Sequence, residues 1–146
     1  MMITVNFPKP AFRFKKENGT EFIFDAIRKQ WLVLTDEEWI RQNFIQYLVQ
    51  SLHYPAAFIA VEKEIMLGEL KKRFDILIYD QQHKPWMMIE CKGTAIELDE
   101  SVLQQVLRYN ISVPVSFLLI TNGHYTLGWQ KIGIDLQLIQ QIPPWK

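Results

Sequence analysis

Charged side chains interrupt two apolar segments of the sequence at positions where buried strands are expected. Asp75 lies within residues 74–78, and Glu90 and Lys92 end the next apolar run. Because buried strands are normally apolar, charges at these positions need an explanation. The loop at residues 80–85 joins the two segments, and a symmetric hairpin around it places Asp75 opposite Glu90.

The predicted hairpin brings two carboxylates and an amine to one face of a sheet. Opposed side chains in an antiparallel pair have Cβ atoms roughly 4.5–5.5 Å apart, which is close enough for Asp75 and Glu90 to bind one cation. Without a cation the two carboxylates would repel each other, and a hard divalent ion would remove that repulsion. Lys92 shares this face by the strand period, whereas Cys91 points to the core. A surface ion-pair cluster, with Lys92 neutralising Glu90, explains the same three charges equally well.

The helix expected before these strands offers a third carboxylate. Thr35 is a suitable N-cap residue and Glu38 stands at the capping-box position, so the helix is predicted to begin at Asp36. Glu37 shares a row with positions 40, 44 and 48 on the buried side, which makes it a better candidate for the site than Glu38. The helix dipole also favours an acid in the first turn, so Glu37 has a purely structural explanation as well.

The surrounding segments predict an α/β fold of the α+β type, with a mixed sheet flanked by helices. An Asn-Gly turn at residues 18–19 predicts an N-terminal β-hairpin. Helical periodicity predicts one helix from Asp36 until residues 53–55 end it, and a second over residues 98–110. Because the second helix separates two apolar strands, those strands can be parallel neighbours. Further strands are expected at residues 31–34, 58–61, 73–79, 86–92, 115–121, 125–129 and 136–139.

Composition indicates one soluble domain. The chain has 146 residues, 49% of them hydrophobic, and its 16 Lys and Arg balance 16 Asp and Glu. Zero net charge argues against a protein that coats nucleic acid by bulk electrostatics, so any such binding must be local. The single Cys excludes a disulfide framework. Because no apolar run approaches the roughly 18 residues of a membrane span and no signal peptide is visible, a cytoplasmic location is expected. The expected domain comprises a β extension (1–34), a core (35–122), and closing strands with a tail (123–146).

These charged residues follow the order of a known nuclease motif. Asp75, the Glu-x-Lys of Glu90 and Lys92, and Glu37 on the preceding helix resemble the PD-(D/E)xK nuclease superfamily. Phe74 replaces the Pro of the superfamily's name. A Gln-x-x-x-Tyr pair, Gln105 and Tyr109, follows on the second helix, where by itself it would be more typical of a helix interface or a core edge. Within the superfamily, residues 35–122 are similar to the N-terminal nuclease domain of type I restriction enzyme R subunits, here as a small stand-alone protein. The similarity is carried by residues 37–42, 71–77, 89–92 and 108–110.

The resemblance implies a restriction-endonuclease-like fold and a divalent-metal-dependent DNA endonuclease. Mg²⁺ or Mn²⁺ would be held by Asp75, Glu90 and the main-chain carbonyl of Cys91, with Glu37 binding directly or through water. The metal would polarise the scissile phosphate and lower the pKa of a bound water. Lys92 would orient that water and stabilise charge on the phosphoryl oxygens. Gln105 and Tyr109 would support Lys92 or contact the phosphate backbone, and the product would carry a 5′-phosphate.

Binding to DNA must then come from local basic residues. The candidates are Lys71, Lys72 and Arg73, which directly precede Asp75, together with Arg41 and Arg108. Each of them is also compatible with an ordinary solvated charge. The chain lacks a P-loop motif, so translocation would need a partner such as other restriction or repair subunits, and cutting both strands of a duplex would favour a homodimer. The alternative function is a non-catalytic nucleic-acid-binding or assembly module that retains the nuclease fold.

Overall fold

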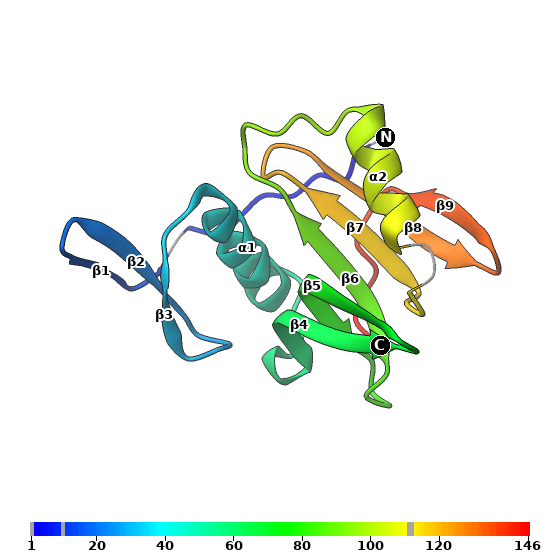
Figure 1. Cartoon of the computed structure of the whole chain (residues 1–146). Coiled ribbons are helices and arrows are strands. Elements are labelled where there is room, and N and C mark those ends of the chain that lie inside the picture. Colours follow the sequence, from blue (N-terminus) through cyan, green and yellow to red (C-terminus); the bar gives the residue numbers. More distant parts are fainter. Residues whose placement is uncertain (1, 10, 111–112) are drawn as a thin grey trace.

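Two separate β-sheets and two α-helices make up the computed structural model, which describes residues 2–9, 11–110 and 113–146 (Figure 1). The smaller sheet is antiparallel and has the order β1-β2-β3, and the larger sheet has the order β4-β5-β6-β7-β8-β9. The strands of the smaller sheet are β1 (Phe14–Glu17), β2 (Thr20–Asp25) and β3 (Gln30–Val33). Those of the larger sheet are β4 (Ile59–Leu67), β5 (Leu70–Tyr79), β6 (Pro85–Cys91), β7 (Phe117–Thr121), β8 (Thr126–Ile132) and β9 (Asp135–Ile139).

Helix α1 (Asp36–Gln46) begins where the sequence predicts and continues into a π-helical segment (Tyr47–Ser51). The Thr35 hydroxyl accepts the Glu38 N–H at 3.0 Å, which satisfies one of the free amide groups of the first turn. The Glu38 carboxylate accepts hydrogen bonds from the side chains of Arg28, Arg41 and Gln42. A short 3₁₀ turn (Ala56–Phe58) precedes β4, and α2 covers Glu100–Asn110.

The pairing of β5 with β6 follows the predicted hairpin up to Ile78, and the register then shifts by one residue, so that Tyr79 pairs with Pro85. Ile76 pairs with Ile89 and Leu77 with Met88, so the next position along this register aligns Asp75 with Glu90. Strands β6 and β7 are parallel, which confirms the predicted crossover through α2. All other neighbouring strands are antiparallel, and the described part of the chain therefore has the predicted mixed α+β fold.

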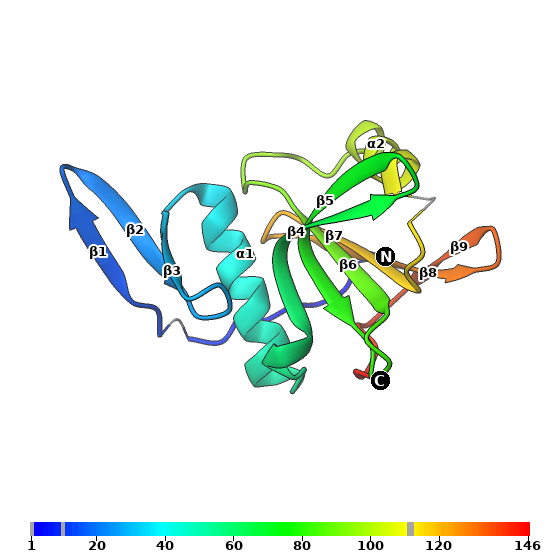
Figure 2. The ribbon, with the colours of Figure 1, turned by 60° about the horizontal axis from the view of Figure 1, so that its bottom comes forward.

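Two apolar clusters lie on opposite faces of the larger sheet. Helix α1 packs on one face, where Phe44 and Leu48 join Ile76 and Ile89. On the other face, Val106 of α2 and neighbouring strand residues form the second cluster. Figure 2 shows the two helices on different sides of the sheet. Fully buried side chains of this size each contribute roughly 1.5–3 kcal/mol to folding, so Phe44 and Leu48 hold α1 and its π-helical extension against the strands that carry the charged residues.

The smaller sheet begins with the predicted hairpin. Asn18 and Gly19 have φ values of 51° and 81°, the left-handed pair of a type I′ turn, whose twist matches that of the flanking strands. Residues 62–72 differ from the prediction, because β4 and β5 extend through them to a hairpin end at Gly68. Much of this part of the hairpin is exposed, so its residues carry many charges and show little alternation of apolar and polar side chains. The apolar pattern that identifies a strand is therefore absent.

Candidate active site

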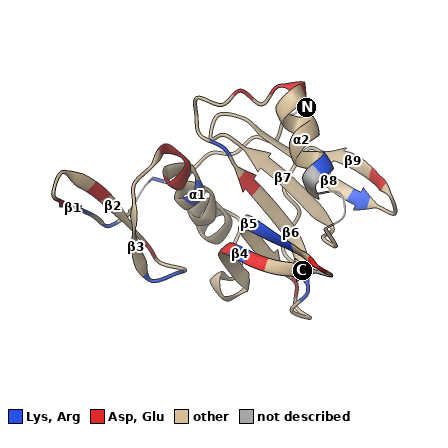
Figure 3. Ribbon diagram, in the orientation of Figure 1, with Lys and Arg blue, Asp and Glu red and all other residues tan. Residues whose placement is uncertain are grey.

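Four predicted site residues converge where α1 meets β5 and β6. Glu37 comes from the first turn of α1, Asp75 from β5, Glu90 from β6, and Lys92 directly follows β6. The Asp75 carboxylate accepts the N–H of Cys91 at 2.8 Å. The Glu90 and Lys92 side chains lie 3.8 Å apart, and the negative charge of Asp75 acts on Glu90. Figure 3 shows acidic residues at the start of α1 and on β4 and β6, beside basic residues on β5.

An irregularity in β5 lets Asp75 reach this position. Phe74 and Leu77 both pack in the cluster on the α2 side, although strict alternation would place residues three apart on opposite faces. The residue of β4 that lies opposite Asp75 is Glu62, and its backbone is left-handed, with a φ of 50°. The strand pairs on either side of this position are regular. Asp75 therefore joins neither apolar cluster, and its carboxylate lies between α1 and the end of β6.

Arg41 is the central cation of this cluster. The sequence predicts a different role for it, in DNA binding. Its Nη2 lies 3.0 Å from the Asp75 carboxylate, 3.1 Å from that of Glu37 and 3.2 Å from that of Glu62. Its Nη1 lies 2.6 Å from Glu38. Because its side chain is only 4% exposed, the structure places Arg41 inside the acidic cluster and not on a surface that DNA could reach. The spacing of Arg41 from the two glutamates, three and four residues, is the signal that could have identified this role.

The pKa values of the two glutamates at the site, Glu90 and Glu37, are raised by burial and by neighbouring acids. Burial and the negative charge of Asp75 raise the pKa of Glu90 to about 7, although Lys92 opposes the shift. The pKa of Glu37 is raised for the same reasons, with Arg41 and Lys92 acting against the change. Burial raises the pKa of the Cys91 thiol, so it stays protonated at neutral pH and supplies backbone groups, not a thiolate.

An open pocket of about 340 Å³ lies between α2 and the end of β6. Glu90, Lys92, Gln105, Val106 and Asn110 line it. Gln105, a predicted site residue, thus lines the same pocket as Glu90 and Lys92. Asn110, which the sequence does not single out, donates through Nδ2 to the Val106 carbonyl at 2.9 Å, while its buried Oδ1 has no hydrogen-bond partner among the described residues. A bound donor could satisfy that oxygen.

The roles of Tyr109 and of the metal ligands stay predictions. The side chain of Tyr109 lies outside the described residues. In the described part of the chain, no group of three or more His, Cys, Asp and Glu side chains is arranged to hold a metal ion. Asp75 and Glu90 contribute two carboxylates, and the Glu37 carboxylate is paired with Arg41. The metal ligands therefore stay a prediction.

The basic residues proposed for DNA binding have different surroundings. Lys71 lies 3.6 Å from Glu64, and Arg73 forms an ion pair with Glu62; both side chains are exposed. Lys72 is buried, with 7% of its surface accessible. Arg108 is exposed in the last turn of α2. Lys71, Arg73 and Arg108 therefore remain accessible to a phosphate backbone.

Comparison with known proteins places these residues in a family. A search of curated proteins finds no match. None of the helices among the described residues is long and apolar enough to cross a bilayer. A family model described as "Type I restriction enzyme R protein N terminus (HSDR_N)" matches residues 36–143. This match covers more than half of the chain and includes every predicted site residue, while β1 to β3 lie outside it. The chain therefore belongs to the family of type I restriction enzyme R protein N-terminal domains.

Proposed function

We propose that the chain is a divalent-metal-dependent endonuclease of the PD-(D/E)xK type that hydrolyses phosphodiester bonds in DNA. Family membership gives it a restriction-enzyme-related role. The observation that carries the proposal is the convergence of Asp75, Glu90 and Lys92 at the junction of α1 with the larger sheet. Two acids and an amine, brought to one point by β5 and the end of β6, are suited to bind a phosphate and its activating cation.

The chemistry of the donors fits Mg²⁺ or Mn²⁺. Asp75 and Glu90 offer carboxylate oxygens, the ligands that hard cations prefer. The raised pKa of Glu90 supports this assignment, because a nearby cation would stabilise its ionised form. The Cys91 carbonyl and Glu37 are the proposed additional ligands. When bound, the ion would polarise the scissile phosphate and lower the pKa of a water molecule.

The other site residues would bind the phosphate or hold the metal ligands in place. The Lys92 ammonium, beside Glu90 at the pocket, would donate hydrogen bonds to phosphoryl oxygens as negative charge develops on them. Gln105 lines the same pocket and would position the phosphate through its amide, and Tyr109 would assist it. Arg41 holds the Asp75 carboxylate on one side, while the Cys91 N–H holds it on the other.

Plasmid cleavage tests this function. Purified protein is incubated with supercoiled plasmid and Mg²⁺ or Mn²⁺, and nicked and linear products are measured. We expect cleavage that EDTA abolishes and that Lys92→Ala slows roughly 10²-fold or more. The matched control is Lys84→Ala, which removes the same charge from an exposed loop and should cleave normally. Equal cleavage by the Lys92→Ala protein would contradict the proposed role of the site.

The alternative is a non-catalytic nucleic-acid-binding or assembly module, and one observation favours it. The Arg41 guanidinium already neutralises part of the acidic cluster through Asp75, Glu37 and Glu38, so the cluster is held together without an added ion. Plasmid that is retained by the protein in a gel-shift assay but not cleaved under any metal condition would support this alternative.

A further inference from the structure

One face of the smaller sheet carries aromatic rings with cations above them. Residues 13 and 15 share a face by the strand period, and the register places Lys15 opposite Phe22 and Phe24 opposite Trp31. We call this the aromatic face and define it by Arg13, Lys15, Phe22, Phe24 and Trp31. Its three rings are partly exposed and belong to neither apolar cluster of the larger sheet.

The cations on the aromatic face are held by the rings. The Arg13 guanidinium carbon lies 4.7 Å from the centroid of Phe24 and 5.3 Å from that of Trp31. Lys15 Nζ lies 4.9 Å from Trp31 and 5.4 Å from Phe22. Lys15 also forms an exposed ion pair with Glu17, whereas the structure records no ion pair for Arg13 with any described residue. The Arg13 charge is therefore available to an external anion.

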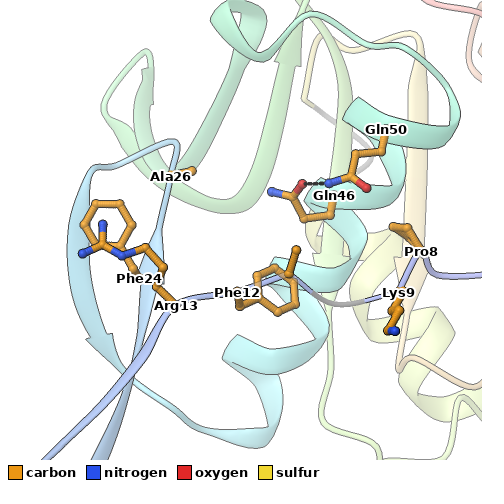
Figure 4. Close-up of a pocket in the computed structure, with 9 residues that line it drawn as sticks. Pro8, Lys9, Phe12, Arg13, Phe24, Ala26, Gln46 and Gln50 are labelled. Carbon is orange, nitrogen blue, oxygen red and sulfur yellow. Dashed lines mark hydrogen bonds between the residues drawn. The ribbon is translucent and has the colours of Figure 1, made fainter.

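A pocket of about 120 Å³ adjoins this face (Figure 4). Arg13 and Phe24 line one side, Lys9 lines another, and the side-chain amides of Gln46 and Gln50 close it from α1 and its π-helical extension. The pocket has two cations and no acid among its lining residues. A negatively charged group with hydrogen-bonding edges would suit these surroundings.

Charge is distributed unevenly along the sequence. Residues 1–34 contain six Lys and Arg against three Asp and Glu, a formal charge of +3, and residues 35–146 carry the opposite charge of −3. The positive segment contains the smaller sheet, which lies outside the family match. An anionic partner is therefore favoured at this sheet.

We propose that the aromatic face and its adjoining pocket bind single-stranded nucleic acid. Unpaired bases stack on aromatic rings and on arginine planes, while phosphates contact lysine and arginine, and the aromatic face offers both kinds of group within one small area. A duplex covers the faces of its bases and cannot use the rings in this way. The proposal does not depend on the nuclease activity, because it concerns a different sheet and requires no metal.

Fluorescence anisotropy in EDTA tests the proposal separately from cleavage. The probe is a fluorescein-labelled oligothymidylate of roughly 16 nucleotides, and the protein is the whole chain. We expect Trp31→Ala to weaken binding about tenfold and the double variant Arg13→Ala/Lys15→Ala to do the same. The matched control, Lys16→Ala/Lys84→Ala, removes the same charge from exposed positions outside the aromatic face and should bind like the unmodified chain.

Several results would overturn the proposal. Absence of binding by the unmodified chain would do so, as would equal weakening by the control double variant, which would indicate bulk charge alone. An abasic oligomer of the same length, or a duplex, that binds as tightly would exclude base stacking. Circular dichroism verifies that each variant is folded. Because Trp31→Ala could disturb the sheet, the double variant of the exposed Arg13 and the partly exposed Lys15 carries the decisive comparison. Ultraviolet crosslinks that map to the aromatic face would support the proposal, and crosslinks confined to α2 would contradict it.

Discussion

Arg41 links the acidic side chains of α1, β4 and β5 through ion pairs to Asp75, Glu38 and Glu62. The guanidinium group is buried, and its Nε has no hydrogen-bond partner among the described residues. Several carboxylates thus share one arginine, and removal of that arginine would leave negative charges facing one another in a poorly solvated region. Arg41 is therefore a structural cation of the acidic cluster.

We predict that Arg41→Ala lowers the free energy of unfolding by about 3–5 kcal/mol, because Asp75 loses its cationic partner and the buried Glu38 loses one of its two arginines. Urea denaturation followed by circular dichroism measures the change. Arg108→Ala, which removes the same group from the exposed end of α2, should change stability by no more than about 0.5 kcal/mol. Equal effects of the two substitutions would show that the Arg41 ion pairs contribute little.

The raised pKa of Glu90 predicts a pH dependence of stability in the absence of metal. The folded protein keeps the Glu90 proton up to about pH 7, whereas the unfolded chain loses it near the ordinary value of 4.5. The contribution of Glu90 to stability is therefore fully present below pH 4.5 and is lost as pH rises through about 7, with a slope of at most about 1.4 kcal/mol per pH unit. Urea denaturation in EDTA at pH values across this window should show the fall, and Glu90→Gln should reduce it to the part that the raised pKa of Glu37 contributes. An unchanged slope in the variant would assign the effect to other groups.

Strict alternation fails between Phe74 and Leu77, and the register shifts near the loop, between Ile78 and Tyr79. The strand period, with a loop taken as symmetric, nevertheless predicts that Asp75 and Glu90 align. The observed register agrees. Arg41 and Asn110 could not be identified in the same way. A guanidinium group reaches several neighbours from one backbone position, and its partners on β4 and β5 depend on how α1 packs on the sheet. The metal itself is still a prediction.

At the scale of elements, the start of α1 positions Glu37 and Arg41. The Thr35 hydroxyl caps the helix through the N–H of Glu38, and the Asp36 carboxylate accepts hydrogen bonds from the N–H and hydroxyl of Thr94 in the segment after β6. The cap and this contact together hold the first turn of α1 against the end of β6.

We predict that Thr35→Ala lowers stability by about 1 kcal/mol, the usual cost of losing an N-cap. Thermal denaturation measures the loss, and Thr4→Ala, at an exposed position outside helices and strands, serves as the matched control. If α1 positions the site, Thr35→Ala should also reduce plasmid cleavage at temperatures where the protein is still folded. Unchanged stability would mean that the hydroxyl is replaced by water as the cap.

Most elements could be predicted because their apolar positions repeat with the period of a helix or a strand. Residues 62–72, at the turn end of the β4-β5 hairpin, could not be predicted as strands, because their exposed side chains form no apolar face. The π-helical continuation of α1 at Tyr47 and the irregularity at Glu62 were also not predictable. Both arise from local backbone geometry that single-residue patterns do not encode.

At the scale of the whole molecule, Arg28 joins the smaller sheet to the family domain. Its guanidinium lies 2.5 Å from Asp25, 3.1 Å from Glu38 and 3.7 Å from Glu62. Burial alone would raise the pKa of Asp25, but hydrogen bonds from Arg28 outweigh it and lower the pKa. The single domain expected from composition stays a prediction, and Arg28 offers a way to test how firmly its parts are joined.

We predict that Arg28→Ala speeds hydrogen exchange of the backbone amides in β1 to β3, while the six-stranded sheet keeps its protection. The buried Asp25 and Glu38 would lose a charged partner, at a cost of about 3–5 kcal/mol. Hydrogen exchange followed by mass spectrometry measures this, with Lys16→Ala, a neighbouring exposed cation, as the control. Faster exchange throughout both sheets would instead show that they unfold as one unit.

Crystals grown with Mn²⁺ test the central claim most directly. The account predicts an anomalous-scattering peak between Asp75 and Glu90, within coordination distance of an oxygen atom from each carboxylate. A map without a peak at that position, at an Mn²⁺ concentration at which the same protein cleaves plasmid, would contradict it.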